Sequence, residues 1–286
     1  MNALFIFTLL AVLMLTGMPI SISLGLTVLS FLFAMTHVPL ESVALKLFTG
    51  IEKFEIMAIP FFILAGNFLT HGGVAKRMIN FATSMVGHWY GGLGLAGVLA
   101  CALFAAVSGS SPATVVAIGS ILLPAMVKAG FPKKFGAGVI ATSGALGILI
   151  PPSIVMVMYS VATNTSVGAL FMAGVVPGIA LACTLGGVTW YRAKKFNYPR
   201  QVKSTWGERW KAFRDSVWGL LLIVVVMGGI YTGIFTPTEA AAMSAVYAFI
   251  CAVFIYRDLG MKDVPRVLIN SANMSAMLLY IITNAV

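Results

Sequence analysis

Charge is scarce in this chain: of its 286 residues, 9% are charged and 60% are hydrophobic. Roughly a quarter of the residues in soluble domains are charged, so the composition excludes a soluble globular fold and predicts an all-α polytopic membrane protein. Acidic residues are the scarcer kind, 8 against 18 lysines and arginines, which leaves a net charge of +10. This excess does not predict nucleic-acid binding, because the basic residues gather between apolar spans, as in cytoplasmic loops of membrane proteins.

Cysteine and histidine are also scarce, with three of each. Cys101, Cys183 and Cys251 lie in apolar stretches without CxxC or metal-like spacing. An intramembrane enzyme would need a nucleophile beside a base, or paired acidic groups, yet no histidine or lysine falls within an expected span. We therefore expect no enzymatic activity and no cofactor.

The N-terminal apolar run, Met1 to Thr36, is too long for a signal peptide and lacks a basic start, so it should stay in the mature protein. It forms either one long tilted helix or two short helices broken near Gly17-Met-Pro19. The loop from His37 to Glu55 has no positive bias and is expected on the periplasmic side. At the other end the chain stops at Val286 inside an apolar stretch, which predicts a truncated chain.

Three basic loops are expected on the cytoplasmic side of the membrane. Their basic residues are Lys76 and Arg77, then Lys128, Lys133 and Lys134, and finally Arg192, Lys194, Lys195, Arg200, Lys203, Arg209, Lys211 and Arg214. Further spans are expected at Ile56–Thr70, Val217–Phe235, Ala240–Ile255 and Val267–Val286.

Two amphipathic helices are expected beside the basic loops. The first would place four apolar residues opposite four polar ones: Val74, Met78, Phe81 and Met85 against Lys76, Arg77, Asn80 and Ser84. The second is a short surface helix from Thr205 to Phe213, begun by a capping box of Thr205 and Glu208.

A polar, helix-breaking cluster, Ser108-Gly-Ser-Ser-Pro-Ala-Thr114, lies near the middle of the charge-free run from Met78 to Val127. Because the loops holding Arg77 and Lys128 should share one side of the membrane, this run goes in and comes back. Two full crossings would do that, and so would a re-entrant hairpin with the cluster at its tip. Backbone that leaves a helix at membrane depth needs replacement partners, so the cluster is a candidate binding site.

A second break, Gly147-Ile-Leu-Ile-Pro-Pro-Ser153, interrupts the first of two passes expected between Phe135 and Tyr191. Proline has no N–H, so a carbonyl four residues earlier loses its helical donor. The carbonyls freed are that of Ser108 by Pro112, that of Gly147 by Pro151 and that of Ile148 by Pro152.

Free carbonyls and small hydroxyls at membrane depth suit a hard monovalent cation, for which sodium is the natural candidate. Ser111 followed by Pro112 also predicts an N-cap and a first helical residue, and hence a half-helix whose positive end favours an anionic group. The alternative is that the small residues only permit close helix packing.

A third motif predicts a helix start: Thr236, Pro237 and Glu239 fit a capping box. An added role of Glu239 near the site stays open, because an ionisable residue at membrane depth is a functional candidate.

With these motifs the chain resembles the large membrane subunit of the tripartite ATP-independent periplasmic (TRAP) transporters, of the C4-dicarboxylate permease type. The matching segments, in order along essentially the whole chain, are Ala106–Ser120, Gly147–Ser153, Gly174–Gly178 and Gly233–Ala241. The resemblance implies a multi-pass protein of the bacterial inner membrane and an elevator-type secondary transporter, in which a transport domain with helical hairpins slides against a scaffold. It also implies sodium as the coupling ion, a periplasmic binding protein that delivers an organic anion, and a small membrane subunit as partners.

The resemblance also assigns residues. The substrate would contact Ser110, Ser111, Ala113, Thr114, Pro152 and Ser153, and sodium would be held through Ser108, Ser111, Gly147, Ile148, Ile150 and Pro152. The chain would divide into scaffold-like helices (1–75), a transport-domain-like unit (76–191), a basic cytoplasmic loop (192–215) and an incomplete second repeat (216–286).

One feature departs from the family: its members continue into a second inverted repeat with its own hairpin, and this sequence stops before it. If the chain ends at Val286, we expect no transport by it alone. The competing interpretation is an ion channel or a non-transporting structural membrane subunit, because carbonyl-lined breaks also build ion filters.

Overall fold

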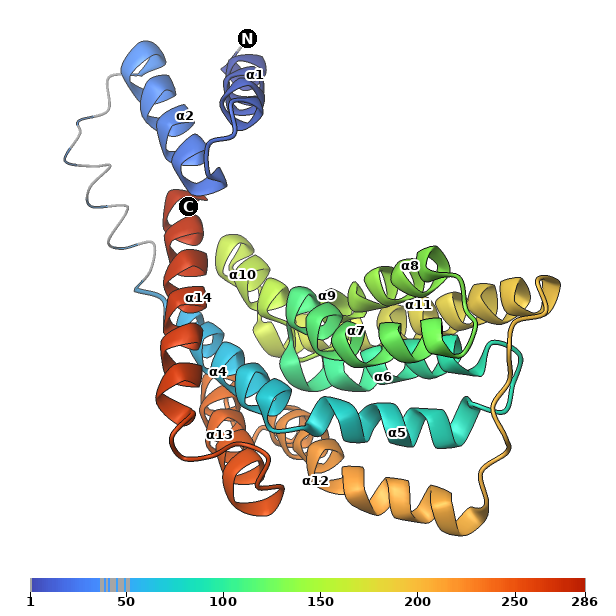
Figure 1. The fold of residues 1–286 in the computed structure, drawn as a ribbon. Helices are drawn as coiled ribbons and strands as arrows, with labels where there is room; N and C mark the ends of the chain where they lie inside the picture. Colours follow the sequence, from blue (N-terminus) through green and yellow to red (C-terminus); the bar gives the residue numbers. More distant parts are fainter. Residues whose placement is uncertain are drawn as a thin grey trace.

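A computed structural model describes residues 2–36 and 52–285 of the chain, together with residues 39, 41, 45 and 49. Within those residues every regular element is a helix, which confirms the predicted all-α fold (Figure 1). Six helical segments there are long and apolar enough to cross a membrane, and one bent pair of helices adds a seventh candidate. The six are Phe54–His71, Ser111–Lys128, Val167–Lys195, Trp206–Tyr231, Pro237–Ile255 and Val264–Asn284.

The N-terminal run forms two short helices, α1 (Asn2–Leu15) and α2 (Ile20–Met35), which decides between the two alternatives left open by the sequence. Gly17 between them has a φ of +83°, and Pro19 directly precedes α2. A left-handed glycine and a proline without an N–H both interrupt the helical ladder. The loop expected on the periplasmic side lies mostly outside the described residues.

A second group of helices surrounds α4 (Figure 1). Its members are η1 (Phe54–Met57), α4 (Ala58–His71), α13 (Pro237–Ile250), its π-helical extension η2 (Cys251–Ile255), and α14 (Val264–Ala285). Phe68 of α4 meets Phe249 of α13 edge to face, with ring centroids 5.4 Å apart. Asn67 of α4 donates from Nδ2 to the Ser271 hydroxyl of α14 at 2.7 Å. Segments from the two ends of the chain thus share one core.

Two helices pack side by side along one edge of the molecule, α5 (Val74–Val86) and α12 (Trp206–Tyr231) (Figure 1). Gly219 allows their close approach, because a Cβ at that position would lie 2.7 Å from Val74 Cγ1. The Ser216 hydroxyl of α12 also donates to the Arg77 carbonyl of α5 at 2.9 Å.

The amphipathic character predicted for α5 is confirmed, but its buried face is rotated from the predicted one. Val74 and Met78 are buried as expected, whereas Met85 is exposed and Ser84 is buried. Ser84 tolerates burial because its hydroxyl donates to the Phe81 carbonyl of the same helix at 2.7 Å.

The separate surface helix predicted from Thr205 to Phe213 is wrong, because these residues begin α12 and the helix continues into the next span. The capping box itself is confirmed: the Thr205 N–H donates to the Glu208 carboxylate at 2.8 Å, and the Glu208 N–H donates to Thr205 Oγ1 at 3.3 Å. No glycine or proline lies between Glu208 and Trp218 to end the helix.

The remaining helices form the third group, which contains both sequence breaks (Figure 1). They are α6 (Gly92–Ser108), α7 (Ser111–Lys128), α8 (Lys133–Gly144), α9 (Leu146–Leu149), α10 (Ile154–Thr163) and α11 (Val167–Lys195). α6 and α7 are joined by two residues only, Gly109 and Ser110. The segment from α8 to α10 bends by 43° at its break, which confirms the predicted break, and α11 follows it as a candidate span.

Candidate functional site

The first break is a buried turn between α6 and α7. α6 ends at Ser108, and Gly109 follows with a left-handed φ of +61°. Such a C-terminal turn favours glycine because a Cβ would be strained there. Ser108 and Thr114 are fully buried, which favours the re-entrant hairpin over a loop exposed to the periplasm.

The helix start at this tip differs by one residue from the prediction. Ser110, not Ser111, is the N-cap of α7, and its Oγ accepts from the Ala113 N–H at 3.5 Å. Pro112 therefore stands at the second helical position, where the first-turn N–H has no helical partner and its loss costs little. The half-helix itself, with its N-terminal end at the tip, is as predicted.

Hydroxyl groups link the two sides of the tip. Ser108 Oγ lies 3.1 Å from Thr114 Oγ1, and Thr114 Oγ1 also donates to the Ser110 carbonyl at 2.8 Å. The predicted residues Ser108, Ser110 and Thr114 are thus in mutual contact.

The second break lies where α9 gives way to α10. Ile150 leaves the helix with an extended backbone, a cis peptide bond joins Pro151 to Pro152, and Ser153 precedes α10. Among the described residues no backbone hydrogen bond outside the helices ends on the carbonyls of Ser108, Gly147 or Ile148. This agrees with the proline argument made from the sequence.

The two breaks meet directly. The Ile154 N–H at the start of α10 donates to the Gly109 carbonyl at the hairpin tip, at 3.1 Å. A Cβ built on Gly109 would lie 2.8 Å from the Pro152 carbonyl oxygen, and one on Gly147 would lie 2.8 Å from the Ser111 nitrogen. Two glycines therefore allow backbone to pack on backbone across the junction.

Glycines of neighbouring helices also pack closely against the junction. A Cβ on Gly66 of α4 would lie 3.3 Å from the Ser108 carbonyl oxygen. On α11, a Cβ on Gly174 would lie 2.5 Å from the Leu149 carbonyl oxygen, and one on Gly178 would lie 2.8 Å from Ile150 Cγ1. The junction therefore combines close helix packing with carbonyls that lack helical donors.

Ser153 adds an unpartnered oxygen to this junction. Its side chain is fully buried, and its Oγ has no hydrogen-bond partner among the described residues. A buried polar atom without a partner is costly unless water, an ion or a ligand supplies one. Residues 108–114 and 147–153 contain no charged side chain, so the junction is a neutral set of oxygens.

The junction therefore unites most of the predicted site residues. Ser110, Ser111 and Ala113 lie at the tip, and Gly147 and Pro152 touch its backbone. Ile150 packs on α11, and Ile148 has an exposed side chain, so only its carbonyl is a candidate ligand.

Thr236 and Glu239 form the predicted capping box at the start of α13. The Glu239 carboxylate accepts from the Thr236 N–H and hydroxyl, both at 2.8 Å, and the Glu239 N–H donates to Thr236 Oγ1 at 3.3 Å. Glu239 is exposed. The described contacts explain it as a cap and do not bring it to the junction.

Sequence reasoning missed several residues of the junction and its surroundings. Gly109 and Ile154 supply the hydrogen bond between the two breaks. The only hint of this in the sequence was Gly109 itself, a glycine between two serines at the end of a helix. Lys53 was also missed: its Nζ donates to the Val161 carbonyl and to Asn164 Oδ1 at the end of α10, both at 2.6 Å. Lys53 lies 108 residues before Val161 in the sequence, and no local pattern predicts a contact over that separation.

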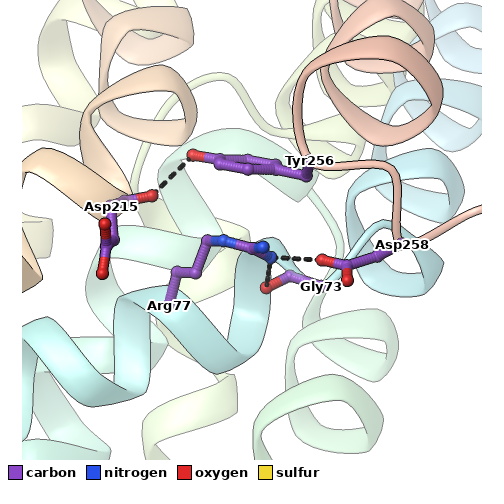
Figure 2. A network of polar contacts seen from close by, with 5 residues as sticks. All are labelled: Gly73, Arg77, Asp215, Tyr256 and Asp258. Atoms are coloured by element: carbon purple, nitrogen blue, oxygen red, sulfur yellow. Dashed lines mark hydrogen bonds and ion pairs between the residues drawn. The ribbon is translucent and has the colours of Figure 1, made fainter.

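A polar network fixes the start of α5, far from the tip in sequence. Figure 2 shows the Arg77 guanidinium between the Gly73 carbonyl and the Asp258 carboxylate, with the Tyr256 ring beside it. The guanidinium carbon lies 3.9 Å from the Tyr256 ring centroid, and the Tyr256 hydroxyl donates to the Asp215 carbonyl at 2.9 Å. Arg77 thus joins α5, α12 and the α13–α14 connection.

Comparison with known proteins identifies the family. The sequence model of the tripartite ATP-independent periplasmic transporter, DctM component, matches residues 7–286. The chain belongs to this family. The family consists of multi-pass permeases of the bacterial inner membrane rather than enzymes, as the sequence predicted.

Several curated relatives have names that state their role. The C4-dicarboxylate TRAP transporter large permease protein DctM of Rhodobacter capsulatus is 76% identical over 100% of this chain and 68% of its own length. The protein of the same name from Vibrio cholerae is 50% identical over 98% of this chain and 66% of its own. The sialic acid TRAP transporter large permease protein SiaM of Vibrio cholerae is 36% identical, over 92% and 62%. The chain thus spans about two thirds of the length of the relatives it matches.

Proposed function

We propose that the protein carries out sodium-driven secondary transport of an organic anion, such as a C4-dicarboxylate or a sugar acid, across the inner membrane. The observation that carries this proposal is the direct junction of the two breaks, through the bond from the Ile154 N–H to the Gly109 carbonyl. Discontinuous helices that meet near the middle of a transporter are where such proteins bind their ions and substrates.

Sodium would be held by the neutral oxygens of the junction. The carbonyls of Ser108, Gly147 and Ile148 lack helical donors, and Ser153 Oγ is buried without a partner. A set of carbonyl and hydroxyl oxygens without carboxylates suits a monovalent cation better than a divalent one, whose protein sites usually include carboxylates.

The organic anion would bind at the N-terminal end of α7. Ser110 caps this helix, and the first-turn N–H groups and the helix dipole favour negative charge there. Ser110, Ser111, Ala113 and Thr114 would line this side of the substrate, and Pro152 and Ser153 the other.

Names of the relatives support an anionic substrate: C4-dicarboxylate for two of them and sialic acid for a third. We propose that a periplasmic binding protein delivers the substrate and that a small membrane subunit completes the scaffold. The third helix group, with both breaks, would then move as a transport domain in an elevator mechanism.

Uptake in proteoliposomes tests this function. The permease, with this chain continued through the second repeat that the family resemblance implies, is reconstituted with its small subunit and binding protein, and entry of a radiolabelled C4-dicarboxylate is measured with sodium or with potassium outside. The proposal predicts saturable uptake that needs both sodium and the binding protein. Equal uptake in potassium would overturn the sodium site, and conductance without the binding protein would favour the channel interpretation.

A further inference from the structure

We propose that the cavity lined by His88, Trp89, Tyr90, Trp190 and Arg200 binds the phosphate headgroup of an anionic phospholipid from the cytoplasmic leaflet. This site is distinct from the junction of the two breaks and does not depend on the transport function. The cavity has a volume of about 380 Å³, which can admit a headgroup but not a pair of acyl chains.

Three segments build the walls of this cavity and are fixed to one another. The turn between α5 and α6 is anchored to the segment after α11, because the Gln201 N–H donates to the Gly87 carbonyl at 3.0 Å. The same turn touches the end of α11: a Cβ on Gly91 would lie 2.3 Å from the Ala193 Cβ. Backbone contacts therefore fix the segments that carry the lining side chains relative to one another.

Cationic groups at this cavity are not neutralised by protein carboxylates. The Arg200 guanidinium carbon lies 3.2 Å from the Tyr90 ring centroid, and Lys194 Nζ lies 5.1 Å from the Trp190 ring centroid. Within the described residues the ion pair between Arg77 and Asp258 is the only one. Arg77 in Figure 2 is thus satisfied by a carboxylate, a carbonyl and a ring, whereas Arg200 has a ring as partner and a free charge.

A phosphate oxygen is an acceptor that Arg200 and Lys194 could share, because both groups can donate. His88 lines the cavity, but its Nδ1 is sealed from it and is not available to a ligand.

The position of the cavity favours a lipid over a soluble phosphate. It lies at the basic end of α11, whose last turn contains Arg192, Lys194 and Lys195. Trp89 and Trp190 are exposed at 52% and 39%, and exposed tryptophans mark the level of the headgroups. Basic pockets between helices on the cytoplasmic side are typical sites for anionic headgroups.

Acyl chains attached to such a headgroup have an apolar surface to follow. Val176 and Ile179 are exposed on α11, at 74% and 57%, and their spacing from Trp190 places them on the same side of the helix as the cavity. The cavity and this surface together match one lipid molecule, with its phosphate at the basic end and its tails along the helix.

Native mass spectrometry of the purified protein in detergent tests the proposal. Phosphatidylglycerol and phosphatidylcholine with the same acyl chains are titrated against the wild type and against the double variant Arg200→Gln, Lys194→Gln. Since each basic residue near the surface contributes roughly 1 kcal/mol, phosphatidylglycerol should bind the variant at least about tenfold more weakly. Phosphatidylcholine should bind both proteins weakly.

The matched control is the double variant Lys203→Gln, Lys211→Gln, which removes the same charge from exposed positions outside the cavity. It should keep phosphatidylglycerol affinity within about threefold of wild type. Equal loss in both double variants would overturn the proposal, and so would equal binding of the two lipids.

If glycerol phosphate without acyl chains binds as tightly as phosphatidylglycerol, the ligand is a soluble phosphate and the lipid proposal is wrong. Lys194→Gln alone, at an exposed side chain, should weaken phosphatidylglycerol binding about fivefold and keeps the test valid if the Arg200 variant does not fold.

Discussion

At the residue scale, single glycines determine how closely the two breaks approach each other. A Cβ on Gly147 would lie 2.8 Å from the Ser111 nitrogen and 2.9 Å from the Ser110 carbonyl carbon. Both neighbours are backbone atoms, which cannot turn aside as a flexible side chain can. The contact therefore limits position 147 to glycine.

The substitution Gly147→Ala should lower the free energy of unfolding by about 1–3 kcal/mol, the usual cost of overpacking. Gly138→Ala is the matched control on α8, because a Cβ there meets no atom within 4 Å. That control should be neutral or stabilising by up to about 1 kcal/mol, since alanine favours a helix. Thermal unfolding in detergent measures both variants, and equal midpoints for the two would contradict the packing described at this junction.

Two buried serines at the junction should respond differently to alanine. Ser108 Oγ contacts Thr114 Oγ1 at 3.1 Å, so Ser108→Ala should cost about 1 kcal/mol of stability. Ser153 Oγ has no partner among the described residues, so Ser153→Ala should be neutral or slightly stabilising in sodium-free buffer. Thermal unfolding of the two variants without sodium gives the comparison. A larger loss from Ser153→Ala than from Ser108→Ala would show that the Ser153 hydroxyl already has a protein partner.

The sequence located the residues of the junction but not their contacts. Prolines identify freed carbonyls by covalent chemistry alone, which is why Ser108, Gly147 and Ile148 could be predicted. The choice of Ser110 over Ser111 as N-cap depends on the backbone angles at the tip. The bond from Ile154 to Gly109 joins residues 45 positions apart, and no local pattern specifies such a pairing.

At the scale of elements, two helices begin with the same capping box. In both α12 and α13 the N-cap threonine accepts from the third residue at 3.3 Å, and the glutamate accepts in return at 2.8 Å. Local sequence fully specifies this motif, so both boxes could be predicted. The continuity of α12 could not be predicted, because its amphipathic first part and its apolar second part have different sequence patterns.

Equivalent caps allow a matched test of Glu239. Thr205→Ala and Thr236→Ala should each cost about 1 kcal/mol of stability, the usual loss of an N-cap. If Glu239 serves only as a cap, Glu239→Gln should leave sodium-dependent uptake at the level of Glu208→Gln. Unfolding midpoints and proteoliposome uptake measure the two effects. Loss of uptake in the Glu239 variant alone would show a further role of this carboxylate near the site.

At the scale of the whole molecule, the Arg77 network joins parts of the chain that are far apart in sequence. It links α5 to the connection after η2 through Asp258, and the Tyr256 hydroxyl reaches α12 (Figure 2). Burial raises the pKa of the Tyr256 hydroxyl to about 12, so this group remains a neutral donor at physiological pH. The network should therefore hold the α5–α12 pair against the group around α4.

The substitution Asp258→Asn should loosen this link. We expect faster hydrogen exchange in the first turn of α5 and a coupling energy with Arg77 of about 1 kcal/mol in a double-mutant cycle, because the pair is partly exposed. Lys76→Gln is the control, since Lys76 is the exposed neighbour of Arg77 on the same helix. Unchanged exchange in the Asp258 variant, or an equal change in the control, would contradict this role.

The overall architecture was predictable from the sequence only in part. Apolar length and basic loops specified an all-α membrane protein and most of its spans, because the bilayer imposes both patterns. The grouping of α4 with α13 and α14, from opposite ends of the chain, was not predicted. That grouping depends on side-chain pairs such as Asn67 with Ser271 and Phe68 with Phe249, which hydropathy does not reveal.

The joined breaks should bind sodium, and the thermal unfolding midpoint as a function of sodium concentration tests this most directly. A ligand that binds only the folded state stabilises it by an amount that grows with its concentration. Sodium should therefore raise the midpoint, an equal concentration of potassium should not, and Ser153→Ala should reduce the sodium effect. Equal midpoints in sodium and potassium, or an undiminished sodium effect in the Ser153 variant, would contradict the proposed site.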